Sequence, residues 1–116
     1  MAKKSELRDI HVDELVFDHL NPRYEALNLN KGNLTDKELI SLIEQDKETV
    51  TLSQSIKQLG IQDPIWIQER EDGKYIIVEG NRRVAALKML IRDNETCDVE
   101  DYDFNIVPAN VFYLIS

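Results

Sequence analysis

The chain has 116 residues, which is enough for one hydrophobic core and too few for two, so we expect a single domain over residues 1–116. Apolar residues make up 42% and charged residues 31%, which excludes a low-complexity or disordered chain. The net charge of −8 repels nucleic acid over most of the surface and argues against general DNA binding by this domain.

Neither a membrane span nor a secretion signal is visible in the sequence. No apolar run approaches the roughly 20 residues that cross a bilayer, and the first residues lack an apolar signal core. Cys97 is the only cysteine and has no internal disulfide partner. These features predict a cytoplasmic location without a membrane partner. The apolar run at 111–116 suggests the amino-terminal part of a longer protein, because fraying chain ends are usually polar.

The first third of the chain predicts a strand, two loops and a helix. Apolar residues at alternate positions within 8–17 indicate a short strand and a turn. Asn21-Pro22 predicts a loop, since a proline keeps the preceding residue out of helical geometry, and 28–33 reads as another. A helix is expected from Thr35, where Thr35 and Glu38 form a capping box.

The middle of the chain predicts a helix followed by a β-hairpin. Leu52, Ile56 and Leu59 share one helical face within about 51–59, and Gly60 is placed to end that helix. Two strand-forming runs, 64–67 and 75–78, flank an Asp-Gly turn, which is the strongest local signal in the sequence.

The last third predicts a helix over 82–92, a solvated acidic segment over 93–103, and strands over 104–108 and 111–115. Together these elements give the α+β class: a small mixed sheet with packed helices, in which a hairpin leads into a helix.

The turn Gly80-Asn81-Arg82-Arg83 is the candidate functional site. A helix start presents free backbone amides and a partial positive charge, which attract anions. Glycine allows a close approach to a ligand, and arginine can hold phosphate oxygens with paired hydrogen bonds. Two arginines at this end oppose the helix dipole, so folding alone does not favour them. The alternative is that Arg82 and Arg83 pair with nearby carboxylates.

The order of motifs around this turn resembles the ParB amino-terminal domain of the ParB/sulfiredoxin superfamily. The resemblance rests on Leu52-Ser-Gln-Ser-Ile56, on Gly60-Ile-Gln-Asp-Pro-Ile65, on the hairpin, and on Glu79-Gly-Asn-Arg-Arg-Val-Ala-Ala, and it spans about 8–115. Asn21-Pro22-Arg23 is similar to an upstream family loop near the nucleotide. Asn81 stands where the family usually has glutamate.

The resemblance implies a nucleotide-binding module. Gly80, Asn81, Arg82 and Arg83 would hold the phosphates of CTP or ATP, with Asn21 and Arg23 contributing from the upstream loop. Mg²⁺ is expected beside a triphosphate, because hard divalent ions bridge phosphate oxygens. Nucleotide binding would then switch self-association into a homo-oligomer or the binding of a protein partner.

Two other functions remain open. Glu79 adjoins the turn and is a candidate general base for a ParB-like kinase, NTPase or nuclease, although a strand-end surface carboxylate is the simpler interpretation. The third function is a protein-interaction domain that binds no nucleotide. Sulfiredoxin chemistry is disfavoured, since its cysteine position is occupied by Asn81 and Cys97 lies outside the matched motifs. Trp66 is expected to pack under a helix, and Tyr24 is a weaker candidate for contacting a base.

Overall fold

The computed structural model describes residues 2–17 and 36–115, and the segments outside these ranges include Asn21, Arg23, Tyr24 and Thr35. The elements in chain order are β1 (Ala2–His11), the 3₁₀ turn η1 (Val12–Glu14), β2 (Leu15–Val16), α2 (Asp36–Glu44), α3 (Lys47–Leu59), β3 (Ile65–Glu69), β4 (Tyr75–Glu79), α4 (Asn81–Arg92) and β5 (Ile106–Ile115). The α+β class is therefore confirmed.

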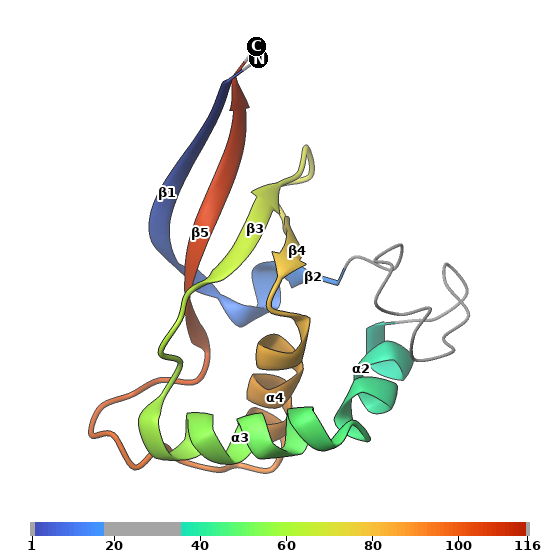
Figure 1. The fold of residues 1–116 in the computed structure, drawn as a ribbon, viewed down its shortest axis with the longest axis vertical. Helices are drawn as coiled ribbons and strands as arrows, with labels where there is room; N and C mark the ends of the chain where they lie inside the picture. Colours follow the sequence, from blue (N-terminus) through green and yellow to red (C-terminus); the bar gives the residue numbers. More distant parts are fainter. Residues whose placement is uncertain (1, 18–35, 116) are drawn as a thin grey trace.

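The strands form one five-stranded mixed sheet in the order β1-β5-β3-β4-β2. β1 pairs antiparallel with β5 over its whole length, from Ala2 opposite Ile115 to His11 opposite Ile106. β3 and β4 form the predicted hairpin, with a register shift between Trp66 and Ile67, and β3 runs parallel to β5. Figure 1 shows β1 and β5 as a long pair at one end of the molecule and the three helices gathered at the other.

One core joins the sheet to the helices. Along β3 and β5 alternate side chains are fully buried, namely Ile65, Ile67, Val107, Ala109 and Val111. These side chains cluster with Val84, Ala85, Ala86 and Leu87 of α4. Alternation of this kind follows from the two-residue period of a strand. The small alanines of α4 let the helix approach the strands closely.

The side chains that alternate with this core lie on the other face of the sheet. Trp66 and Phe112 are only partly buried and stack there, with ring centroids 4.8 Å apart and planes at 25°. The expectation that Trp66 packs under a helix is therefore wrong. Because Trp66 is one residue out of phase with Ile65 and Ile67, the pleat of β3 turns it away from the helices.

Several boundaries differ from the sequence expectations. β1 covers ten residues where the sequence predicted only a short strand within 8–17, because residues 2–7 continue the pairing with β5. The expected strands 104–108 and 111–115 are one continuous strand. α3 begins at Lys47 instead of about residue 51, since the Asp46 side chain accepts a hydrogen bond from the Glu48 amide and caps the helix there. Gly60 ends α3 as expected, at φ 75°.

The acidic segment after α4 is more ordered than its composition predicts. The amide of Asp98 donates to the Lys57 carbonyl at 2.8 Å, and Lys57 pairs with Glu95 at 3.0 Å. The Tyr102 hydroxyl accepts a hydrogen bond from the Ile61 amide at 2.8 Å. The prediction of a solvated segment is confirmed, since the residues of 93–103 are exposed apart from the partly buried Cys97 and Tyr102. The contacts above nevertheless tie the segment to α3 and to the residues that follow it.

Candidate functional site

The candidate turn leaves β4 at Glu79 and enters α4 through Gly80. Gly80 has φ 120° and ψ 20°, a conformation that residues with a side chain rarely adopt. A Cβ built on Gly80 would lie 2.5 Å from Cγ2 of Ile65. The glycine is therefore required by the backbone turn and by the packing of β3, which is a structural reason independent of any ligand.

The first turn of α4 has neither a capping side chain nor an acidic residue. Gly80 provides no side chain to accept hydrogen bonds from the first amides, and its carbonyl accepts from Val84 at 3.0 Å. No side chain in the first turn of α4 therefore compensates the partial positive charge at the start of this helix. Such an end attracts an acceptor that carries negative charge.

Asn81, the first residue of α4, is buried to 4% exposure. Neither Oδ1 nor Nδ2 of its amide has a hydrogen-bond partner among the residues that the structure describes. A buried polar group without a partner costs about 1–3 kcal/mol, so a position of this kind is rarely left unsatisfied. A polar ligand or ordered water beside the helix start would remove this cost.

Arg82 reaches the start of α3. Its Nε and Nη2 atoms both lie 2.9 Å from Oδ2 of Asp46, and its Nη1 lies 3.1 Å from Oε2 of Glu48. Since Asp46 caps α3, the contact brings the positive ends of two helices to one place. This pairing is the arrangement that the alternative interpretation of the arginines predicts for Arg82.

The carboxylate of Asp46 is an anion held between the start of α3, which it caps, and the Arg82 side chain of α4. The hydrogen bond from the Glu48 amide lowers the pKa of Asp46, and the Arg82 guanidinium lowers it further, while desolvation works in the opposite direction. The side chain of Glu48 is 74% exposed, so its pairing with Arg82 is a surface contact of little energetic weight. The site therefore favours negative charge.

Arg83 points to a different partner. Its Nη1 atom donates to the backbone carbonyls of Asp63 and Pro64, which precede β3. Arg83 thus fastens the segment before β3 to the start of α4. A guanidinium has five N–H donors, so these two carbonyls leave donor capacity for a further acceptor.

An open groove of about 470 Å³ adjoins Arg82. It is lined by Lys47, Glu48, Thr51, Leu52, Ser55 and Arg82, and so runs along α3 from the two helix starts. A hollow of this size falls within the range of small-molecule sites. Its lining combines two cations, the carboxylate of Glu48, two hydroxyls and an apolar side chain at Leu52, a composition that suits a polar ligand with an apolar part.

The remaining sequence candidates fall in two groups. Glu79 is partly buried at the end of β4, opposite Trp66 in the strand register. Asn21 and Arg23 lie outside the described residues, so the structure does not relate them to the turn. Sequence reasoning missed Asp46, although its position three residues before a helical run of Thr49, Leu52 and Ile56 was an available capping signal.

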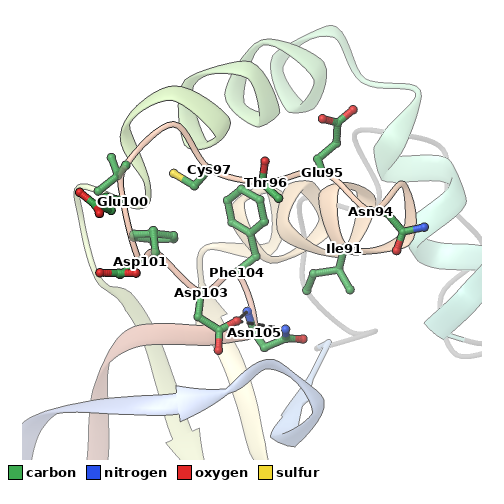
Figure 2. A pocket seen from close by; sticks show the side chains of 12 residues that line it. Ile91, Asn94, Glu95, Thr96, Cys97, Glu100, Asp101, Asp103, Phe104 and Asn105 are labelled. Atoms are coloured by element: carbon green, nitrogen blue, oxygen red, sulfur yellow. Dashed lines mark hydrogen bonds between the residues drawn. The ribbon is translucent and has the colours of Figure 1, made fainter.

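A larger hollow of about 520 Å³ lies under the segment from Asn94 to Asn105. Figure 2 shows its lining, with Phe104 projecting toward the α4 side and Asp103 bonded to Asn105. The amide and side chain of Asn105 lower the pKa of Asp103. Within the residues that the structure describes, no group of three or more metal-binding side chains occurs, here or at the candidate turn.

Comparison with known proteins places these features in a family. The model of the ParB N-terminal domain matches residues 1–106. A solved structure, the C-terminally truncated chromosome-partitioning protein ParB from Caulobacter crescentus complexed with CTP-γ-S, matches with a TM-score of 0.57 and 21% identity. The match covers 96% of this chain and 46% of that one, so the chain spans less than half of its structural neighbour. A comparison with curated proteins found no match.

No helix in the described residues is long and apolar enough to cross a bilayer. The family match covers most of the sequence, and the fold is similar to that of the solved ParB structure. The chain belongs to the ParB N-terminal domain family.

Proposed function

We propose that this domain binds a nucleoside triphosphate, with the phosphates at the meeting point of the α3 and α4 starts. The observation that carries the proposal is the buried amide of Asn81, unpartnered in the described part of the chain, at a helix start that has no cap of its own. Family membership and the likeness to a ParB solved with CTP-γ-S support it.

In this proposal the backbone amides of the turn and Arg82 hold the phosphates. Arg82 is 38% exposed on its side chain, and a partly exposed ion pair contributes only about 0–1 kcal/mol. A triphosphate carries several negative charges, so it competes well against the single charge of Asp46. Arg83 adds donors while it holds the carbonyls before β3, and Arg23 and Asn21 complete the site from the upstream loop.

Mg²⁺ enters this site with the nucleotide. Since the described residues contain no ready-made cluster of metal ligands, the phosphate oxygens would supply most of the coordination. The carboxylate of Glu48, which lies beside Arg82, is the described oxygen ligand best placed to contribute. The Mg²⁺ ion would neutralise part of the negative charge on the phosphates.

Binding is tested by titrating CTP and ATP, each with and without Mg²⁺, and following heat release or thermal stabilisation. We expect Arg82→Ala and Asn81→Ala to weaken binding about tenfold or more, since each removes a contact to a charged group. Arg92→Ala is the matched control, because Arg92 lies on the same helix at its other end and pairs with Glu44. Equal affinity in Arg82→Ala and the parent protein would refute the site.

Catalysis is a separate question about the same site. Glu79 acts as a base if the protein releases phosphate from bound CTP or ATP and the Glu79→Gln variant loses this activity while it keeps its affinity for the nucleotide. Binding without any phosphate release or transfer would leave a switch module, which is the function we favour.

A further inference from the structure

β1 is a long edge strand whose outer side pairs with no other strand in the part of the chain that the structure describes. Five successive residues of this strand, 5–9, are all exposed, although the strand has two faces. Leu7 is 64% exposed, more than any other large apolar side chain in the described residues. An edge strand with unpaired backbone groups and an exposed apolar residue near its middle can pair with another strand, and its charged side chains restrict the partner and register that it accepts.

We propose that this edge binds a second copy of the chain, β1 against β1, so that two five-stranded sheets join into one. Figure 1 shows β1 as the outermost strand, running beside β5 at the end of the molecule away from the helices. The inference concerns a surface distant from the Gly80 turn and does not depend on nucleotide binding.

The geometry of antiparallel pairing restricts how two copies of β1 can meet. Directly opposed residues must both point their backbone groups toward the partner or both away from it. When two copies of the same strand pair about a two-fold axis, the axis must therefore pass through a residue position. The residue at that position lies opposite the same residue of the second copy. The candidate centres within the exposed stretch are Ser5, Glu6, Leu7, Arg8 and Asp9.

Charge selects among these centres. Pairing centred on Glu6, Arg8 or Asp9 places each of these side chains against its own copy, which brings like charges together. Pairing centred on Leu7 places Glu6 opposite Arg8 twice and packs the two Leu7 side chains together. It also overlaps residues 3–11 of each strand, whereas a Ser5 centre overlaps only 2–8 and leaves Leu7 opposite a lysine.

Arg8 already makes contacts within its own chain. In the single chain its Nη1 atom donates to the Tyr75 hydroxyl at 3.2 Å, with the guanidinium 5.9 Å from the ring centroid. A hydroxyl is a neutral acceptor, and a carboxylate makes the stronger charge-assisted hydrogen bond. Glu6 of the second copy would add a charge-assisted hydrogen bond to the contacts that Arg8 makes within its own chain.

Oligomeric state and cross-linking test the pairing together. We expect sedimentation and light scattering of the protein to show a concentration-dependent dimer. In a Cys97→Ser background, Leu7→Cys should form a cross-linked dimer on mild oxidation, because the two Cβ atoms oppose each other at the two-fold axis. Ser5→Cys is the matched control: it lies on the same strand face and is exposed, yet its counterpart would be too distant to react.

Variants that reverse the charge at Glu6 or at Arg8 give the most direct test of the proposed register. Glu6→Arg alone and Arg8→Glu alone should each weaken dimerisation about tenfold or more, since two attractive pairs become repulsive. An equimolar mixture of the two variants should restore a dimer, which also shows that both variants are folded. A parent protein that stays monomeric, a mixture that does not associate, or cross-linking of Ser5→Cys as readily as of Leu7→Cys would overturn the proposal.

Discussion

Replacing Asp46 by asparagine should increase the affinity of the protein for a triphosphate. Asp46 now occupies the place that we assign to phosphate, with its Oδ2 atom 2.9 Å from two nitrogens of Arg82. The substitution removes this competing charge and releases the guanidinium. Asparagine caps a helix about as well as aspartate, so α3 keeps its start.

The size of the effect follows from the exposure of the pair. The side chains of Arg82 and Asp46 are 38% and 15% exposed, so water screens the interaction and its worth is about 0–1 kcal/mol. Adding the relief of repulsion between Asp46 and phosphate gives a gain of roughly 1 kcal/mol, or about a fivefold lower Kd. The same lost pair should lower Tm by about 4 °C or less.

The assay is a calorimetric titration with CTP and ATP in the presence of Mg²⁺, at two salt concentrations. Glu44→Gln is the matched control: it removes one negative charge and releases Arg92, whose Nη1 atom lies 2.7 Å from Glu44 at the other end of α4. Its affinity should match that of the parent protein. An unchanged or weaker affinity in a folded Asp46→Asn variant would refute the reasoning that Arg82 is a phosphate ligand.

Three further predictions concern stability. Gly80→Ala should destabilise the fold by at least about 2 kcal/mol in urea unfolding, because the turn needs φ 120° and the new Cβ meets Ile65. Tyr102→Phe should cost about 1–3 kcal/mol and speed deuterium exchange at the Ile61 amide, which loses its acceptor. Folding lowers the pKa of Asp46, so the ionised side chain stabilises the folded state at every pH above the pKa of the unfolded chain, near 3.8. This stabilisation is lost as the pH falls through the lower pKa of the folded state. Melting curves of the parent and Asp46→Asn proteins should therefore converge at low pH.

Each of these predictions has a matched comparison. Gly73→Ala changes a glycine at φ 83° with no atom within 4 Å of the new Cβ, so it should cost less than Gly80→Ala, and equal losses would contradict the packing argument. Tyr75→Phe removes a tyrosine hydroxyl that accepts a hydrogen bond from Arg8 and should leave exchange at Ile61 unchanged. A constant difference between the two melting curves from neutral to acidic pH would contradict the role of the Asp46 charge.

Local signals in the sequence determined much of this fold. The Asp-Gly turn between two strand-forming runs predicted the β3–β4 hairpin, and Gly80 followed by an apolar helical period predicted α4. These features depend on neighbours close along the chain, because turn chemistry and helical period are local properties. The family resemblance was also contained in the order of these local motifs, and the family match confirms it.

Other features were settled by distant parts of the chain. The polar first half of β1 is a strand only because β5 pairs with it. The face on which Trp66 lies follows from its phase in β3, but its stacking partner Phe112 comes from the neighbouring strand β5, which is distant in sequence. The acidic segment was ordered by Tyr102 and by contacts with Lys57, which composition does not encode. Pairing and packing partners far apart in sequence override local propensity, as is general for strands and loops.

At the candidate site, too, some features follow from the sequence alone and others only from tertiary contacts. The sequence by itself determined that two arginines follow a glycine at a helix start, and the opposition to the helix dipole marked the place as unusual. Only the tertiary structure decided that Arg82 meets Asp46 at the start of α3, that Arg83 holds the carbonyls before β3, and that the Asn81 amide is buried. The physical reason is that a side chain's partners depend on how helices pack, whereas its position on a helix depends only on its neighbours along the chain.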